Sequence, residues 1–211
     1  MKLWENISGF YVKGNSKMDL KGKKIGFAIT ASFCTVQEIL LPMEKLSSLG
    51  ADLYPVVSEN VNAHSSRFHD RNDYVQRVSE ICGRGVVYTI AQAENFGPVT
   101  QLDLMIIAPA TGTTMAKLAH GISDGAVTMA TKATLRNGSP VLIAPFSNDA
   151  LGANGINIMK LYNTKNIFFV PFGQDDSAKK PNSLAADLML LPEAAICALD
   201  GKQLQPALIT F

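Results

Sequence analysis

The sequence lacks the features that mark several classes of protein. Its formal net charge is +1 over 211 residues, so it has no broad electrostatic field that favours nucleic acid or acidic membranes. No apolar run reaches the length of a membrane span. Cys34, Cys82 and Cys197 lack metal-ligand spacing, and an odd cysteine count without a signal peptide indicates a reducing cytosol. We therefore expect a cytoplasmic protein with no nucleic-acid partner, no membrane and no metal.

The dinucleotide-binding fingerprint Gly-x-Gly-x-x-Gly is also missing, because Gly26 lies inside the first predicted strand. There is no internal repeat and no low-complexity segment. Residues 1–17 show no clear period, although they include Trp4 and Phe10. We interpret residues 1–17 as an extension outside the core, and residues 18–211 as a single α/β domain.

Strand and helix patterns alternate along this domain. The predicted strands are residues 24–29, 52–57, 102–108, 141–144 and 167–170, with a possible short strand at 86–88. The predicted helices are residues 35–49, 72–82, 113–120, 123–136, 153–162 and 192–199. This alternation favours a Rossmann-like three-layer α/β fold, with a mostly parallel sheet covered by helices on both faces.

The most informative stretch joins a buried strand to a helix start. The apolar residues 102–108 run into Pro109-Ala110-Thr111-Gly112-Thr113-Thr114, which places hydroxyls and backbone N–H groups at a helix N-terminus. In an open α/β sheet, phosphate-bearing ligands bind beyond the carboxyl ends of the strands at such positions. This segment therefore predicts a ligand site.

A second hydroxyl-rich loop follows the first strand. Thr30, Ser32 and Thr35 flank Ala31 at a predicted helix start, where they can meet phosphate oxygens. The competing interpretation is that Ser32 or Thr35 simply caps the helix, and this loop alone leaves both open.

Three further loops offer polar groups. In residues 58–68, Arg67 can pair bidentately with a carboxylate or can be an ordinary surface arginine, whereas His64 is interpreted as a surface residue. Pro145 is expected to stop the fourth strand and to lead into Asn148, which is either a ligand contact or a turn residue. Residues 171–183 form a candidate lid, whose lysines either attract an acidic substrate or balance the neighbouring acids.

Together these loops resemble the homo-oligomeric flavin-containing cysteine decarboxylase family of Rossmann-like FMN proteins. That family holds the FMN phosphate with a hydroxyl-rich loop after its first strand, and holds the flavin with a Pro-Ala-Ser/Thr-x-Asn-Thr motif that matches residues 109–114. The asparagine of the motif falls on Thr113. The substrate motif Pro-x-Met-Asn matches at Pro145 and Asn148.

A longer resemblance, from about Met18 to the C-terminus, is to the B-subunit family of dipicolinate synthases of spore-forming bacteria. Residues 20–27, 164–176, 179–183 and 203–206 carry it. It implies oxidation of a dihydrodipicolinate-level intermediate to dipicolinate, together with an A subunit that carries NADP, in the mother cell of a sporulating bacterium. It also implies a homo-oligomer.

The resemblance implies sets of site residues, with no general acid or base assigned. FMN is expected at Thr30, Ala31, Ser32, Ser58, Ala108, Pro109, Ala110, Thr111, Thr113 and Thr114. The small dicarboxylate substrate is expected at Arg67, Asn148 and Lys165. Two alternatives stay open: an FMN-dependent decarboxylase of a small carboxylate, and a non-catalytic subunit that supports the A subunit.

Overall fold

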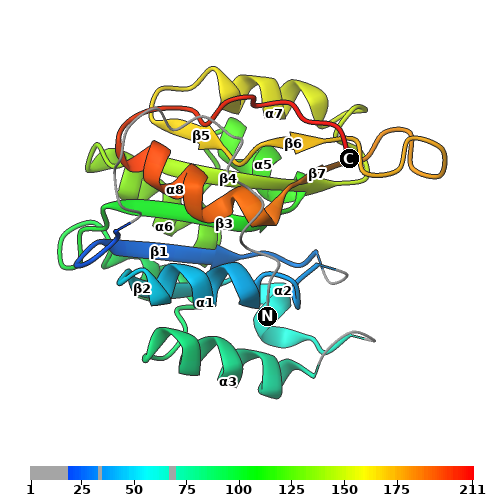
Figure 1. The fold of residues 1–211 in the computed structure, drawn as a ribbon. Helices are drawn as coiled ribbons and strands as arrows, with labels where there is room; N and C mark the ends of the chain where they lie inside the picture. Colours follow the sequence, from blue (N-terminus) through cyan, green and yellow to red (C-terminus); the bar gives the residue numbers. More distant parts are fainter. Residues whose placement is uncertain (1–18, 33–34, 67–69) are drawn as a thin grey trace.

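The computed structural model describes residues 19–32, 35–66 and 70–211. In this part of the chain one sheet lies between two layers of helices (Figure 1), which confirms the predicted fold class. The predicted extension and Arg67 fall outside the described residues. No helix within the described ranges is both long and apolar enough to cross a membrane.

The parallel part of the sheet is built from β1 (Lys24–Ile29), β2 (Asp52–Val57), β3 (Leu104–Ala110), β4 (Val141–Ser147) and β5 (Ile167–Phe169). Their order is β2-β1-β3-β4, and β5 pairs with the first half of β4. The chain moves outward from β1 to β2, and then resumes on the other side of β1 with β3. The carboxyl ends of β1 and β3 therefore flank a topological switch point, where open α/β sheets bind ligands.

The bounds predicted for β1 and β2 are confirmed, whereas β3 starts and ends two residues later than predicted, and β4 ends three residues later. Both strands continue through a proline. Pro109 follows a cis peptide bond, and its carbonyl accepts a hydrogen bond from the backbone N–H of Thr30, the residue that follows β1. The predicted stop at Pro145 is wrong, because Phe146 and Ser147 continue β4 by pairing with a later strand.

That later strand belongs to an antiparallel edge that the sequence patterns did not reveal. β7 (Leu184–Ala186) pairs with the second half of β4, and β6 (Phe172–Gly173) pairs with β7. The C-terminal segment adds a further bridge, between Phe172 and Leu208. The strand predicted at residues 86–88 is reduced to a single bridge between Val87 and Val56.

Helices cover both faces of the sheet (Figure 1). One layer holds α1 (Leu40–Ser48), α3 (Arg71–Cys82), η1 (Leu188–Leu190) and α8 (Leu191–Leu199), and the other holds α4 (Ile90–Glu94), α5 (Gly112–Ala119), α6 (Ala126–Arg136) and α7 (Gly155–Tyr162). A short helix, α2 (Glu59–Ala63), follows β2 within the loop predicted to be irregular. Every residue of β3 is buried, as expected for a central strand between two helical layers.

The first helix begins later than the predicted residue 35. Residues 35–39 form turns, and α1 starts at Leu40. Pro42 explains the difference, because proline has no N–H to donate and its ring collides with the carbonyl four residues earlier. Proline is tolerated in the first turn of a helix, so α1 has to start within a few residues of Pro42.

Candidate functional site

A small cavity lies at the switch point, and most of the residues predicted to hold FMN line it. This switch-point cavity has a volume of about 200 Å³. It is lined from the end of β1 by Thr30 and Ala31, from the end of β2 by Ser58, Glu59 and Asn60, from α5 by Thr111, Thr113, Thr114 and Lys117, and from the start of α6 by Asp124, Gly125, Val127 and Thr128. The structure therefore brings together four segments of the chain.

Thr30 has a structural role at this cavity. Its hydroxyl donates to the carbonyl oxygen of Pro109 at 2.7 Å and accepts from the backbone N–H of Thr111 at 3.0 Å. Since a hydroxyl has one proton and a phosphate only accepts, the Thr30 hydroxyl cannot also donate to a phosphate. In this structure Thr30 borders the cavity and ties β1 to β3, and its contact with FMN stays a prediction.

Three helix N-termini converge on the switch-point cavity. Ser58 is the N-cap of α2, Thr111 is the N-cap of α5, and Gly125 is the N-cap of α6. The hydroxyl of Ser58 accepts from the backbone N–H of Val61, and its proton remains available to donate. Unpaired backbone N–H groups and the helix dipole give such ends a positive potential, so the cavity favours oxygen-rich, anionic or hydroxylated ligands.

Charged side chains in the cavity modify this potential. The carboxylate of Glu59 accepts from the backbone N–H of Ala126 at 3.1 Å, and thereby caps α6 across the cavity. Lys117 forms an ion pair with Asp124 at 2.9 Å, which contributes to lowering the pKa of the exposed Asp124 carboxyl. The sequence did not point to Glu59, Lys117 or Asp124 as site residues. Glu59 could have been predicted, because it directly follows Ser58 at the carboxyl end of a predicted strand.

Other predicted site residues lie elsewhere. Ala108, Pro109 and Ala110 are buried within β3 and are absent from the lining of this cavity, because β3 extends through them. Lys165 is exposed just before β5, at the amino ends of the parallel strands. This edge is opposite to the one that carries the cavities, so the structure does not bring Lys165 to Asn148.

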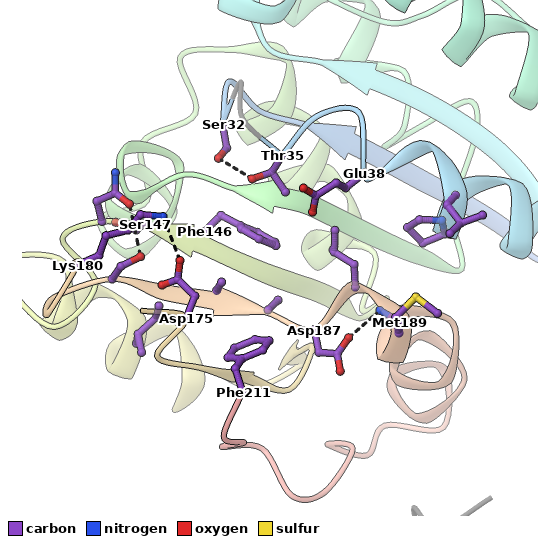
Figure 2. Close-up of a pocket in the computed structure, with 18 residues that line it drawn as sticks. Ser32, Thr35, Glu38, Phe146, Ser147, Asp175, Lys180, Asp187, Met189 and Phe211 are labelled. Carbon is purple, nitrogen blue, oxygen red and sulfur yellow. Dashed lines mark hydrogen bonds and ion pairs between the residues drawn. The ribbon is translucent and has the colours of Figure 1, made fainter. Parts of the chain in front are cut away.

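A larger cavity, the β4 cavity, opens beside the carboxyl end of β4 (Figure 2) and has a volume of about 690 Å³. Figure 2 shows Ser32, Thr35 and Glu38 on one side of it, facing Asp175 and Lys180. Its lining also includes Leu41, Pro42, Phe146, Ser147, Asn148, Ser183, Asp187, Met189 and Phe211. Apolar walls with a few polar groups are typical of sites for small organic ligands.

A hydrogen-bonded network connects the predicted lid to the end of β4. The buried Ser183 donates from its hydroxyl to the Asn148 side-chain oxygen at 3.4 Å, and Lys180 pairs with Asp175 at 3.3 Å. Burial raises the pKa of the Asp175 carboxyl, whereas the hydrogen bond and the positive charge of Lys180 contribute to bringing this pKa below its ordinary value. Asp175 is therefore a carboxylate at neutral pH, and Lys180 both lines the cavity and balances this acid.

The two cavities meet at the end of β1. Ala31 lines the switch-point cavity, whereas the adjacent Ser32 lines the β4 cavity. After β3, Gly112 packs closely against Ser147 and Asn154. A Cβ atom added at Gly112 would lie 2.8 Å from the Ser147 hydroxyl and 2.6 Å from the Asn154 amide nitrogen. Thr111 and Ser147 are thus held on neighbouring strand ends, with one lining each cavity.

The similarity to known proteins agrees with this architecture. A family model described as Flavoprotein matches residues 13–185. The chain belongs to the Flavoprotein family. Within the Flavoprotein family, it is 47% identical over 190 residues to the B subunit of dipicolinate synthase from Bacillus subtilis (strain 168), a match that covers 90% of this chain and 95% of that protein. The predicted resemblance is confirmed.

Solved structures give the same result. The B subunit of dipicolinate synthase from Bacillus halodurans C matches with a TM-score of 0.84 and 46% identity, over 91% of this chain and 98% of that chain. The FMN-dependent cysteine decarboxylase SpaF matches with a TM-score of 0.62 and 21% identity, over 85% of this chain and 98% of that chain. The second likeness shows that the Flavoprotein fold is shared.

Proposed function

We propose that this member of the Flavoprotein family is the B subunit of a dipicolinate synthase. Together with an A subunit, it would oxidise a dihydrodipicolinate-level intermediate to dipicolinate during sporulation. The observation that carries the proposal is the similarity to the Bacillus subtilis B subunit, which extends over nearly the whole of both chains. The two adjoining cavities support it, since they offer separate places for a cofactor and for a small dicarboxylate.

The switch-point cavity fits FMN by the chemistry of its donors. The hydroxyls of Ser58 and Thr113, with the N-terminus of α5, would hold the phosphate and the ribityl chain. FMN, when bound, supplies a two-electron acceptor for ring oxidation. NADP would be carried by the A subunit.

The β4 cavity would hold the dicarboxylate. The Lys180 ammonium has three protons and only one faces Asp175, so it can donate to a substrate carboxylate as well. Ser183 fixes the Asn148 side-chain oxygen, which leaves the amide NH₂ group to donate. Arg67 remains a further predicted carboxylate ligand, argued from its residue type alone.

Oxidation of the dihydropyridine ring to an aromatic ring removes one hydride and one proton. The ring must therefore lie against a hydride acceptor while its carboxylates are held in place. Ser32 and Ala31 separate the β4 cavity from the switch-point cavity by a single peptide. A ring bound beside Ser32 would consequently be close to a flavin bound beside Ala31.

Reconstitution tests the proposal. The A subunit, this chain, and the mixture are each supplied with the lysine-pathway intermediate and NADP, and dipicolinate is measured by chromatography. We expect full dipicolinate formation from the mixture and flavin absorbance in this chain. Full activity of the isolated A subunit would favour a purely supporting role for this chain, and CO₂ release by this chain alone would favour a decarboxylase.

We also propose that the chain is a homo-oligomer. The outer surface of α7 and of the loop before it presents apolar side chains to solvent, with Ile156 76% exposed, Leu151 55% exposed and Met159 53% exposed. Clustered exposed apolar side chains are typical of contact surfaces between subunits. Light scattering at micromolar concentration tests this, and a monomer would contradict it.

A further inference from the structure

The switch-point cavity contains an anionic group of its own at one of its helix N-termini, a position that otherwise favours an anionic ligand. The N-terminus of α6 is capped by Gly125, which has no side chain to satisfy the helix N–H groups. Glu59 supplies that acceptor from 67 positions away in the sequence, through its 3.1 Å hydrogen bond from the N–H of Ala126. A carboxylate thus occupies the positive end of α6.

The fit between Glu59 and Gly125 is close. A Cβ atom added at Gly125 would lie 2.8 Å from one Glu59 carboxylate oxygen and 3.0 Å from the other. Glycine at residue 125 is therefore what lets the carboxylate rest on the helix end. The same carboxylate lines the cavity together with Ser58 and Thr111.

The other charges among the described residues of the cavity lining do not neutralise Glu59. Within the described lining of the cavity, Lys117 is the single basic side chain, and its ammonium is paired with Asp124 at 2.9 Å. A phosphate that enters the cavity therefore meets two carboxylates and one ammonium among the described lining residues, a net negative charge. Like charges a few ångströms apart repel, and the repulsion is stronger near a protein surface than in bulk water.

We infer that Glu59 is a specificity-determining residue that selects against the phosphate of a bound flavin. This inference rests on the proposed flavin site and deepens it. The Glu59 carboxylate can accept hydrogen bonds from the hydroxyls of a ribityl chain, which FMN and riboflavin share. It repels only the phosphate, so this chain binds FMN weakly for a flavoprotein, and discriminates little between FMN and riboflavin.

The test compares the two flavins on the full chain. Glu59→Gln keeps an amide oxygen that can accept from Ala126 and removes the charge. Dissociation constants for FMN and for riboflavin are measured by quenching of flavin fluorescence. We expect the FMN constant to fall about ten-fold, as removal of one like charge at short range predicts, and the riboflavin constant to stay unchanged.

Glu94→Gln is the matched control, because it makes the same charge change on the exposed α4 outside both cavities. It should leave both constants at the wild-type values, and circular dichroism verifies that each variant is folded. Equal shifts for the two flavins, or no shift for FMN in Glu59→Gln, would overturn the role of Glu59 while leaving the flavin site intact. Failure of both flavins to bind any of the proteins would instead overturn the flavin site, and the role of Glu59 with it.

Discussion

Thr30 and Pro109 are joined twice, since the Thr30 backbone N–H donates to the Pro109 carbonyl oxygen at 3.3 Å and the Thr30 hydroxyl donates to the same atom at 2.7 Å. The hydroxyl also accepts from the N–H of Thr111. These bonds hold the carboxyl ends of β1 and β3 together, where both cavities begin.

Replacement of this hydroxyl should destabilise the fold. Thr30→Val keeps the shape of the side chain but removes both hydrogen bonds of the hydroxyl, including the one from the part-buried N–H of Thr111, at a cost of about 1–3 kcal/mol. Urea denaturation measures the change in the free energy of unfolding. Thr30→Ser retains the hydroxyl and should lose much less, and equal losses in the two variants would show that the methyl group matters more than the bonds.

The position of the flavin phosphate can be tested with one charge placed in either cavity. Ser58→Asp keeps a good N-cap for α2 and adds a negative charge to the switch-point cavity, so FMN affinity should fall about ten-fold or more. Ser32→Asp adds the same charge to the β4 cavity and should have a smaller effect. Fluorescence titration with FMN measures both, and a larger loss in Ser32→Asp would place the phosphate on the other side of the β1 loop.

Two adjacent lysines allow a matched test of the substrate cavity. Lys180 lines the β4 cavity, whereas the exposed Lys179 does not. Lys180→Ala should lower kcat/KM of the reconstituted enzyme by about one to two powers of ten, the loss of one charge-assisted hydrogen bond of about 1.5–3 kcal/mol. Lys179→Ala should be nearly silent. Similar kinetics for the two variants would exclude a specific contact between Lys180 and the substrate.

The lowered pKa of Asp175 predicts an acid-dependent contribution to stability. The carboxylate is stabilised in the folded state, so its contribution is present above the ordinary pKa of 3.8 and is lost as the pH falls through the lower folded-state pKa. Asp175→Asn should therefore reduce the slope of unfolding free energy against pH below 3.8. Urea denaturation at a series of pH values measures this slope, and an unchanged slope would contradict the prediction.

The apolar surface of α7 predicts an effect on assembly. Ile156→Lys places a charge on a side chain that is 76% exposed, so the folded monomer should tolerate it while a contact between subunits should not. We expect the molar mass from light scattering to fall. Val99→Lys, at a site 74% exposed outside α7, is the control and should leave the mass unchanged.

The parallel sheet could be predicted from the sequence because its strands form continuous apolar runs. β1 and β2 match their predicted bounds. β3 and β4 were cut short at Pro109 and Pro145, because local rules treat proline as a stop and cannot account for a partner strand that continues the pairing. β6 and β7 escaped prediction, since Phe172–Gly173 and Leu184–Ala186 are too short to show a period.

The residues of the candidate site that follow the carboxyl end of a strand could be predicted from the sequence. Ala31, Ser58 and Thr111 were expected at one edge and do line one cavity. The assignment failed for Lys165, because this residue precedes its strand and therefore stands at the amino end of the parallel sheet, opposite the edge that carries the cavities. Glu59 was passed over, since its partner Ala126 is brought near only by the packing of α6 beside β2.

Ala31 and Ser32 are consecutive residues that face different cavities, and this has a thermodynamic consequence. A ligand that shifts the peptide between them changes the walls of both compartments at once. Linkage then requires reciprocity: whatever factor an occupied switch-point cavity applies to affinity in the β4 cavity, an occupied β4 cavity applies in return. Titration of one ligand at fixed concentrations of the other would measure that factor from either direction, and both directions must give the same number.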